Sequence, residues 1–162
     1  MSDRSSPDAA MFRKAMSRFA TGIAVITAAS GEGVAGMTVN SFTSVSLRPP
    51  IVLWCLDDGA SRFDTFAGAE IWGVSILGAG QKDVSERFSR SNAPLADPEV
   101  IARLGADVPV VAGALAQFAC QTIARHVMGD HLVIAGAVHD SAAIDGDALT
   151  YFASRYGLAR AD

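Results

Sequence analysis

The stretch GMTVNSFTSVSLRPP, residues 36–50, is the part of the sequence that decides the fold. It is rich in valine, threonine and phenylalanine, and with the two preceding residues it predicts a long β-strand over residues 34–46. The prolines at positions 49 and 50 end this strand, because proline cannot donate to a strand ladder. An unusual share of its side chains carry a hydroxyl or an amide. They are Thr38, Asn40, Ser41, Thr43, Ser44 and Ser46.

These polar side chains predict a binding site along the strand. Burying a hydroxyl or amide without a partner costs on the order of 1–3 kcal/mol, so each must meet water or a polar ligand. Strand alternation places Ser41 and Thr43 on one face and the other polar side chains on the opposite face. A strand that is solvated on one face would carry polar residues on that face only. We therefore expect this strand to line a polar ligand.

A possible phosphate-binding motif lies just before this strand. Residues 31–36, GEGVAG, match the spacing G-x-G-x-x-G of dinucleotide-binding turns. That motif needs a helix directly after the glycines, because the helix N-terminus holds the pyrophosphate. The residues that follow here are β-branched or poor helix formers. We interpret the glycines as the turn of a hairpin between strands at 23–27 and 34–46.

The rest of the sequence predicts a mainly β chain. Helices are predicted over residues 7–22 (capped by Ser6), 61–69 (capped by Ser61), 81–90 and 97–104. Further strands are predicted over 51–56, 71–77, 114–123 and 132–138, and the aromatic tail 149–158 is left unassigned. Strands joined mostly by hairpins, with few helices for parallel crossovers, favour an antiparallel barrel with peripheral helices. We expect one domain over residues 1–162, with residues 1–8 as a flexible tail.

Composition and charge exclude several classes of protein. The formal net charge is −4 and 50% of the 162 residues are hydrophobic. An acidic chain is a poor candidate for nucleic-acid binding, and this apolar content excludes a disordered chain. No apolar run reaches the length of a membrane span, and the N-terminus lacks the apolar region of a signal peptide. We therefore expect a cytoplasmic protein that binds neither nucleic acid nor membrane.

The thiols and imidazoles give no sign of a metal site or a disulfide framework. Cys55 and Cys120 both lie in apolar runs, where buried, inert thiols are the usual finding. The three histidines are not arranged at metal-ligand spacing with each other or with the cysteines. We expect no metal.

Several segments, in order along residues 11–158, resemble the short-chain flavin reductases. The quoted segments are FRKAMSRFATGIAVIT, GMTVNSFTSVSLRPP, the strand that ends in Cys55-Leu56, QKDVSERF, PVVAGALAQFAC, the GDH at 129–131 and the terminal Arg155-Tyr156. The resemblance implies a split β-barrel, usually a homodimer, that binds FMN or FAD. It also implies transfer of a hydride from NADH or NADPH to the flavin, for which the cofactor carries the chemistry. The resemblance further implies that the reduced flavin diffuses to a flavin-dependent monooxygenase.

The resemblance also implies roles for individual residues. The residues implied near the isoalloxazine and ribityl groups are Thr38, Val39, Asn40 and Ser41, with Ser44 and Ser46 further along the strand. Those implied near the flavin tail and phosphate are Cys55, Leu56, Ser61, Gln81 and Lys82. His131 and Tyr156 are implied near the nicotinamide, with His131 as the catalytic residue that orients it.

Ordinary structural interpretations remain open for these residues. Lys82 could be a solvated helix start, His131 a turn residue and Tyr156 a packing residue. A related barrel that reduces a ferric chelate or a corrinoid, or that binds flavin without turnover, also remains open. The sequence does not choose FMN over FAD or name the monooxygenase.

Overall fold

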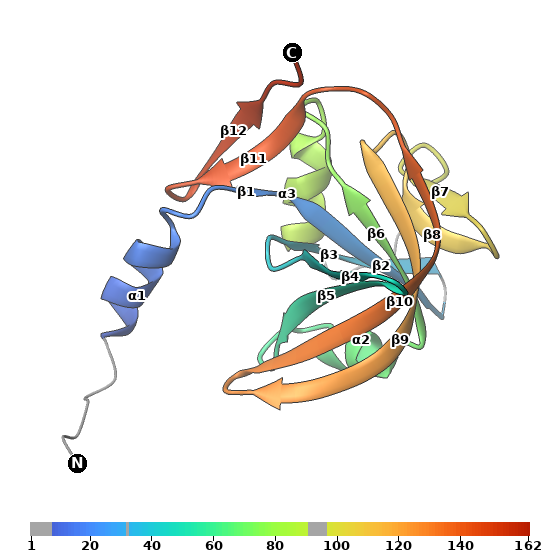
Figure 1. Cartoon of the computed structure of the whole chain (residues 1–162), viewed down its shortest axis with the longest axis horizontal. Coiled ribbons are helices and arrows are strands. Elements are labelled where there is room, and N and C mark those ends of the chain that lie inside the picture. Colours follow the sequence, from blue (N-terminus) through green and yellow to red (C-terminus); the bar gives the residue numbers. More distant parts are fainter. Residues whose placement is uncertain (1–7, 32, 91–96) are drawn as a thin grey trace.

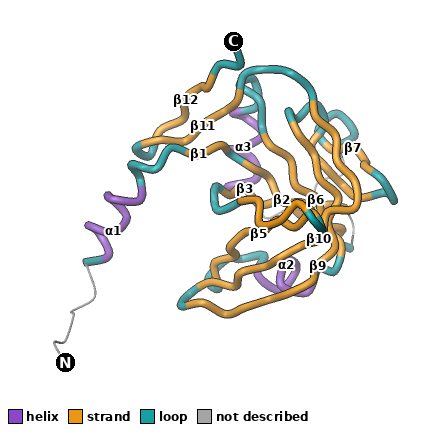
Figure 2. Tube along the Cα trace, in the orientation of Figure 1, coloured by secondary structure: helices purple, strands orange, loops and turns teal. Residues whose placement is uncertain are grey.

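The computed structural model describes residues 8–31, 33–90 and 97–162 as twelve strands and three helices (Figures 1 and 2). The helices are α1 (Ala9–Met16), α2 (Phe63–Gly68) and α3 (Lys82–Arg90). The strands are β1 (Thr21–Gly22), β2 (Ala24–Ser30), β3 (Gly33–Val39), β4 (Thr43–Leu47), β5 (Pro50–Asp57), β6 (Ile71–Ile76), β7 (Ile101–Leu104), β8 (Val108–Val111), β9 (Ala116–Met128), β10 (His131–Ala143), β11 (Ala148–Phe152) and β12 (Arg155–Ala159).

Seven strands form one antiparallel sheet in the order β3-β2-β6-β9-β10-β5-β4. Its two edge strands, β3 and β4, are joined by only three residues, Asn40–Phe42. A link this short forces the sheet to curl until its edges approach each other, which makes a barrel that is open along one seam. The expected antiparallel split barrel with peripheral helices is therefore confirmed.

The interior of the barrel is aromatic. Trp54 meets Phe66 and Trp72 edge to face, with ring centroids 5.7 and 6.2 Å apart, and all three side chains are fully buried. A second apolar cluster lies between α3 and the small sheet β1-β11-β12, with Phe88 and Leu149 among its members. Helix α3 is thus held between the barrel and the C-terminal hairpin.

Helix α1 contributes nothing to either core. Asp8 caps it, accepting a hydrogen bond from the backbone of Ala10, and none of its residues is buried. Figure 1 shows α1 reaching away from the barrel. None of the helices in the described ranges is long and apolar enough to cross a membrane.

Several predicted elements differ from the structure. The strand expected over 34–46 is broken at Asn40–Phe42, because β3 pairs with β2 whereas β4 pairs with β5. The helix expected over 97–104 is wrong, because residues 101–104 pair with Val108–Val111 as a hairpin. The first helix ends at Met16 rather than at Gly22. Helix α2 begins at Phe63 with Arg62 at the N-cap, so Ser61 is not its cap.

The hairpin turn at residues 31–36 is confirmed, and the outcome for the two chain ends is as follows. The glycines at 31–36 lie in the turn of the β2–β3 hairpin and in β3 itself, with no helix after them. The unassigned tail is a hairpin, β11–β12. The tail expected over residues 1–8 lies outside the described residues, except for Asp8, which caps α1.

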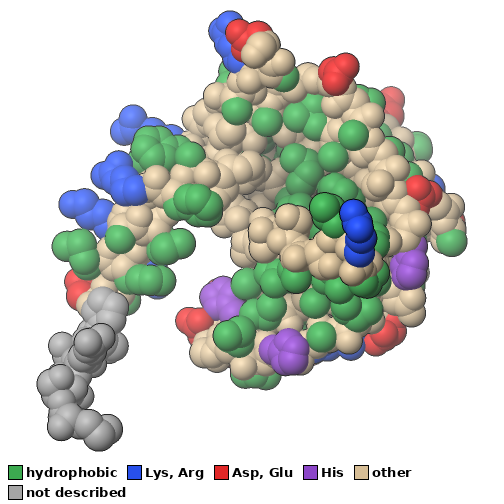
Figure 3. Space-filling view, viewed as in Figure 1, with side chains coloured by type: hydrophobic (Ala, Val, Ile, Leu, Met, Phe, Trp, Pro, Cys, Tyr) green, Lys and Arg blue, Asp and Glu red, His purple; other side chains and the backbone are tan. Residues whose placement is uncertain are grey.

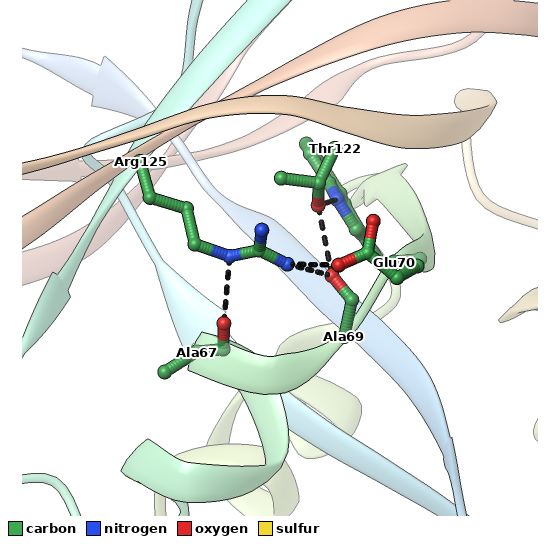
Figure 4. Close-up of polar contacts among 6 residues, drawn as sticks. Ala67, Ala69, Glu70, Thr122 and Arg125 are labelled. Carbon is green, nitrogen blue, oxygen red and sulfur yellow. Dashed lines mark hydrogen bonds and ion pairs between the residues drawn. The ribbon is translucent and has the colours of Figure 1, made fainter.

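Arg125 on β9 holds the end of helix α2 (Figure 4). Its guanidinium donates to the carbonyl of Ala67 at 2.7 Å, to that of Ala69 at 3.0 Å and to Glu70 Oε1 at 2.8 Å. The hydroxyl of Thr122 also donates to Ala69 O. These bonds satisfy carbonyls that the helix end leaves without intrahelical partners.

The first prediction concerns this cap. Arg125→Met keeps most of the side chain's length but removes the donors, so we expect a loss of about 1–2 kcal/mol of unfolding free energy. Chemical denaturation measures it. Arg103→Met is the control, because Arg103 pairs with Asp107 at the exposed end of its hairpin and caps no helix. Equal losses in the two variants would show that the cap contributes nothing specific.

Candidate functional site

The candidate site lies where the barrel opens. Strands β3 and β4 each pair on one side only, so their other edges offer backbone N–H and C=O groups to a ligand. The connector Asn40–Phe42 crosses between these edges. It lies in the centre of the polar stretch that the sequence singles out.

Three grooves meet at Asn40. The first, of about 320 Å³, runs along β1, β2 and Val39 and is called the seam groove. The second, of about 280 Å³, lies between β3, α3 and the C-terminal hairpin and is called the hydroxyl groove. The third, of about 540 Å³, lies between the connector, β5 and α1 and is called the helix groove. Figure 3 shows the surface hollowed between α1 and the barrel.

The Ser41 side chain anchors the connector. Its hydroxyl accepts a hydrogen bond from Cys55 N at 3.0 Å and lies 3.2 Å from Cys55 O, to which it can donate. These contacts fix the connector against β5, so Ser41 shapes the helix groove. Ser41 therefore adds a side-chain tie between the connector and β5 to the β4–β5 ladder.

Thr38 and Tyr156 line the hydroxyl groove. The Thr38 hydroxyl donates to the carbonyl of Ser85 at 2.7 Å. The Tyr156 hydroxyl lies 2.9 Å from that of Ser85, and Lys82 Nζ lies 5.4 Å from the Tyr156 ring centroid. The groove thus combines several hydroxyls with a cation at its rim, a composition that suits a polyol chain ending in a phosphate.

His131 faces the same side of the sheet as Cys55. His131 pairs with Asp57, and Val133 pairs with Cys55. Directly paired residues of antiparallel strands share a face, as do residues two apart along one strand. Cys55 lines the helix groove, so His131 lies about two residues, or roughly 7 Å, further along that face.

His131 is held by its neighbour Asp130. Its Nδ1 lies 2.7 Å from Asp130 Oδ1. This hydrogen bond is the main cause that lowers the pKa of the Asp130 carboxyl, and the charge of Arg13 on α1 acts in the same direction. An ionised carboxylate can only accept, so Nδ1 carries the proton and Nε2 is left for another partner.

Not all of the predicted site residues gather at the seam. Leu56 is fully buried in the barrel core. Gln81 uses both ends of its amide within the fold, accepting from Gly78 N and donating to Ala112 O. Ser44 and Ser46 lie on β4 beyond the connector, and the Ser46 hydroxyl accepts from Arg48 N. Ser61 lies just before α2, and none of the three grooves is lined by it. The roles of these residues stay predictions.

The structure adds residues that the sequence did not indicate. Phe19 and Thr21 precede β2 and line both the seam and the helix groove, and Tyr151 lines the hydroxyl and helix grooves. The buried hydroxyl of Thr21 has no hydrogen-bond partner within the described ranges. An unsatisfied polar group beside an open groove is typical of a site that takes a polar ligand. The sequence does not indicate these residues because they are distant along the chain from residues 38–41.

The site fits a flat, partly polar ring with a polyol phosphate tail. Val39 and Phe42 offer apolar contact, Asn40 and the free strand edges offer hydrogen bonds, and Lys82 offers a cation. These are the requirements of a flavin nucleotide. Fold and site together define a flavin-binding split-barrel protein.

Comparison with known proteins identifies the family. Residues 16–159 match the model described as "Flavin reductase like domain". The chain is 42% identical over 146 residues to "FMN reductase (NADH) SmoA" of Agrobacterium fabrum (strain C58), covering 90% of this chain and 83% of that protein. The chain therefore belongs to the flavin reductase family and is placed among the NAD(P)H:flavin oxidoreductases.

Solved structures agree with this assignment. The styrene monooxygenase flavin reductase (SMOB) from Pseudomonas putida S12 superposes with a TM-score of 0.83 and 37% identity, covering 93% of this chain and 98% of that one. The NADH:FAD oxidoreductase SgcE6 of Streptomyces globisporus C-1027, solved with NAD and FAD fragments, gives a TM-score of 0.86 and 30% identity over 96% and 94% of the chains.

A second prediction uses the two cysteines as reporters of the site. Burial raises the pKa of Cys120 to about 12, and burial also raises the pKa of the half-buried Cys55. The thiolate is the reactive form, so at mildly alkaline pH Cys120 should not react with a disulfide reagent such as DTNB. Cys55 should react slowly, and FMN should slow it further. Cys55→Ser is the control and should abolish labelling. Labelling unchanged by saturating FMN would contradict a flavin ring bound against the connector, to which Cys55 is hydrogen-bonded through Ser41.

Proposed function

We propose that this protein is an NADH-dependent flavin reductase that supplies reduced flavin to a partner monooxygenase. The observation that carries the proposal is the polar connector Asn40–Phe42, held open at the barrel seam in a chain of the flavin reductase family. Two of the relatives named above act with NADH, and the third serves a styrene monooxygenase. Their chemistry is the basis for choosing NADH over NADPH and a monooxygenase as the consumer.

The residues of the chain divide the work of binding. The backbone of residues 38–41, together with Asn40, would hold the polar rim of the flavin ring, and Val39 would contact its apolar part. Lys82 would hold the ribityl phosphate through its charge. Thr38, whose hydroxyl already donates to the Ser85 carbonyl, could accept a hydrogen bond from a ribityl hydroxyl. When bound, the flavin accepts a hydride at N5 from C4 of the nicotinamide, and the protein's contribution is to stack the two rings.

His131 would hold the nicotinamide rather than transfer a proton. With Nδ1 bound to Asp130, its Nε2 can donate or accept one hydrogen bond at the mouth of the helix groove. Tyr156, which lines the hydroxyl groove, would border the site on the side away from His131. We propose His131 as the residue that orients the reducing nucleotide.

The third prediction tests this role. His131→Ala should raise the KM for NADH by about three- to ten-fold, the loss of one hydrogen bond, and should leave the KM for FMN nearly unchanged. Steady-state oxidation of NADH, followed by its near-ultraviolet absorbance at varied FMN, measures both constants. His139→Ala, further along β10 with its ring bonded to Gln121 Oε1, is the control. Equal increases in the KM for NADH and the KM for FMN would contradict the proposed role of His131 in orienting NADH.

The same assay tests the function itself. Purified protein should oxidise NADH only when FMN or FAD is added. Oxidation that needs a ferric chelate or a corrinoid instead of flavin would support the alternative reductases. No oxidation with any pair of nucleotide and flavin would rule out the proposed activity.

We also propose that the protein is a homodimer in which a second copy covers α1. Phe12 and Met16 on α1 are 56% and 53% exposed, and the following Phe19 is 70% exposed. A helix with an apolar face and no buried residue is stabilised by packing against another surface. Sedimentation velocity distinguishes the dimer from a monomer.

Because NADH is an intracellular reductant, we further propose a cytoplasmic location.

A further inference from the structure

Ser85 is the one serine of α3 that is fully buried, although the helix is otherwise strongly polar. Serine is a weaker helix former than alanine, and a buried hydroxyl without a partner is costly. The side chain at this position therefore needs a partner. Its partner is the hydroxyl of Tyr156, 2.9 Å away on β12.

Ser85 joins three separate elements. Its hydroxyl meets Tyr156 on the C-terminal hairpin, and its carbonyl accepts the hydroxyl hydrogen bond of Thr38 on β3. Ser85 itself belongs to α3, one turn after Lys82. These are the elements that enclose the hydroxyl groove. The contact between Ser85 and Tyr156 thus joins residues that are 71 positions apart in the sequence.

The ring of Tyr156 is fixed by the same arrangement. Lys82 Nζ lies 5.4 Å from its centroid, and Tyr151 meets it edge to face with centroids 5.6 Å apart. Lys82 and Ser85 are three residues apart, so they lie on the same face of α3. Helix α3 thus holds Tyr156 at its ring and at its hydroxyl.

We propose that Ser85 is a positioning residue of the flavin site. It fixes the Tyr156 hydroxyl, and through Tyr156 it fixes the wall of the hydroxyl groove that receives the ribityl phosphate. Ser85 lines this groove, but its side chain is fully buried and its hydroxyl is engaged with that of Tyr156, so it acts on the ligand through Tyr156. Its effect on affinity is transmitted through the hydrogen-bonded pair, so the two hydroxyls act as one unit. The proposal rests on the proposed function in taking FMN as the ligand.

A double-mutant cycle tests the proposal. Ser85→Ala and Tyr156→Phe should each weaken FMN binding by about three- to ten-fold, the contribution of one hydrogen bond. The double variant should bind as weakly as either single variant and no more weakly, because the pair is already broken. Quenching of FMN fluorescence measures the dissociation constants, and the KM for FMN should rise by the same factors.

Ser75→Ala controls for the loss of any buried serine hydroxyl. Ser75 is also fully buried, its hydroxyl accepts from Val111 N on β8, and it lines none of the three grooves. This variant should lose stability and keep its FMN affinity. If Ser85→Ala behaves like Ser75→Ala, or if the two single effects multiply in the double variant, Ser85 is not a positioning residue. Wild-type protein that does not bind FMN would contradict the proposed function instead.

Discussion

Replacing Ser41 with alanine should weaken FMN binding by about ten- to a hundred-fold, and it should lower kcat/KM for flavin to a similar extent. The Ser41 hydroxyl makes the contacts with Cys55 N and Cys55 O that hold the connector across the seam. Without them the connector can move, and the free edges of β3 and β4 no longer face the ligand at a fixed spacing.

The measurement is FMN titration, combined with thermal unfolding to show that the barrel remains intact. Ser141→Ala is the control, because Ser141 is exposed on β10 far along the strand from the seam. Wild-type FMN affinity in Ser41→Ala would show that the connector does not form the flavin site. A large loss of stability with unchanged affinity would assign Ser41 to the fold alone.

Replacing Gly73 with alanine should be the most destabilising small substitution in the barrel. A Cβ at this position in β6 would lie 2.1 Å from the backbone oxygen of Pro109 and 2.7 Å from Thr27 Oγ1. The Thr27 hydroxyl donates to that same oxygen, so the added methyl would separate β8 from the barrel and break a buried hydrogen bond. Overpacking and the lost bond together cost about 3–5 kcal/mol.

Thermal unfolding measures this effect, which corresponds to a fall in Tm on the order of 10 °C. Gly68→Ala is the matched control, because a Cβ on Gly68 at the end of α2 meets no atom within 4 Å. That variant should be neutral or slightly more stable, since alanine is the better helix former. Similar melting temperatures for the two variants would contradict the close packing of β6 against β8.

The barrel could be predicted from the sequence because its hairpins are local. The GEGVAG turn was correctly interpreted as part of a hairpin, since strand propensity after the glycines excludes the helix that a dinucleotide motif needs. The break at Asn40–Phe42 could not be predicted in this way. It arises because β4 pairs with β5 rather than continuing along β2, and that choice depends on how the whole sheet closes.

The helix predicted over residues 97–104 is wrong for a similar reason. Asp97-Pro98 has the composition of a helix start, but residues 101–104 pair with Val108–Val111, and this non-local pairing overrides the local signal. The binding residues also divide into those in one local segment and those brought to the site by distant elements. Thr38, Asn40 and Ser41 form a continuous polar segment and were found, whereas Thr21 and Ser85 reach the site only through the small sheet and α3.

The central claim, that this chain passes hydride from NADH to a flavin bound at the seam, is tested most directly by anaerobic mixing. Protein with FMN is mixed with an equal amount of NADH without oxygen, and the visible absorbance of the flavin and the near-ultraviolet absorbance of NADH are followed together. The two bands should be lost with the same rate constant and in equal molar amounts, and Ser41→Ala should slow both losses at subsaturating FMN. Loss of NADH without bleaching of the flavin, or no change in either band, would contradict the account.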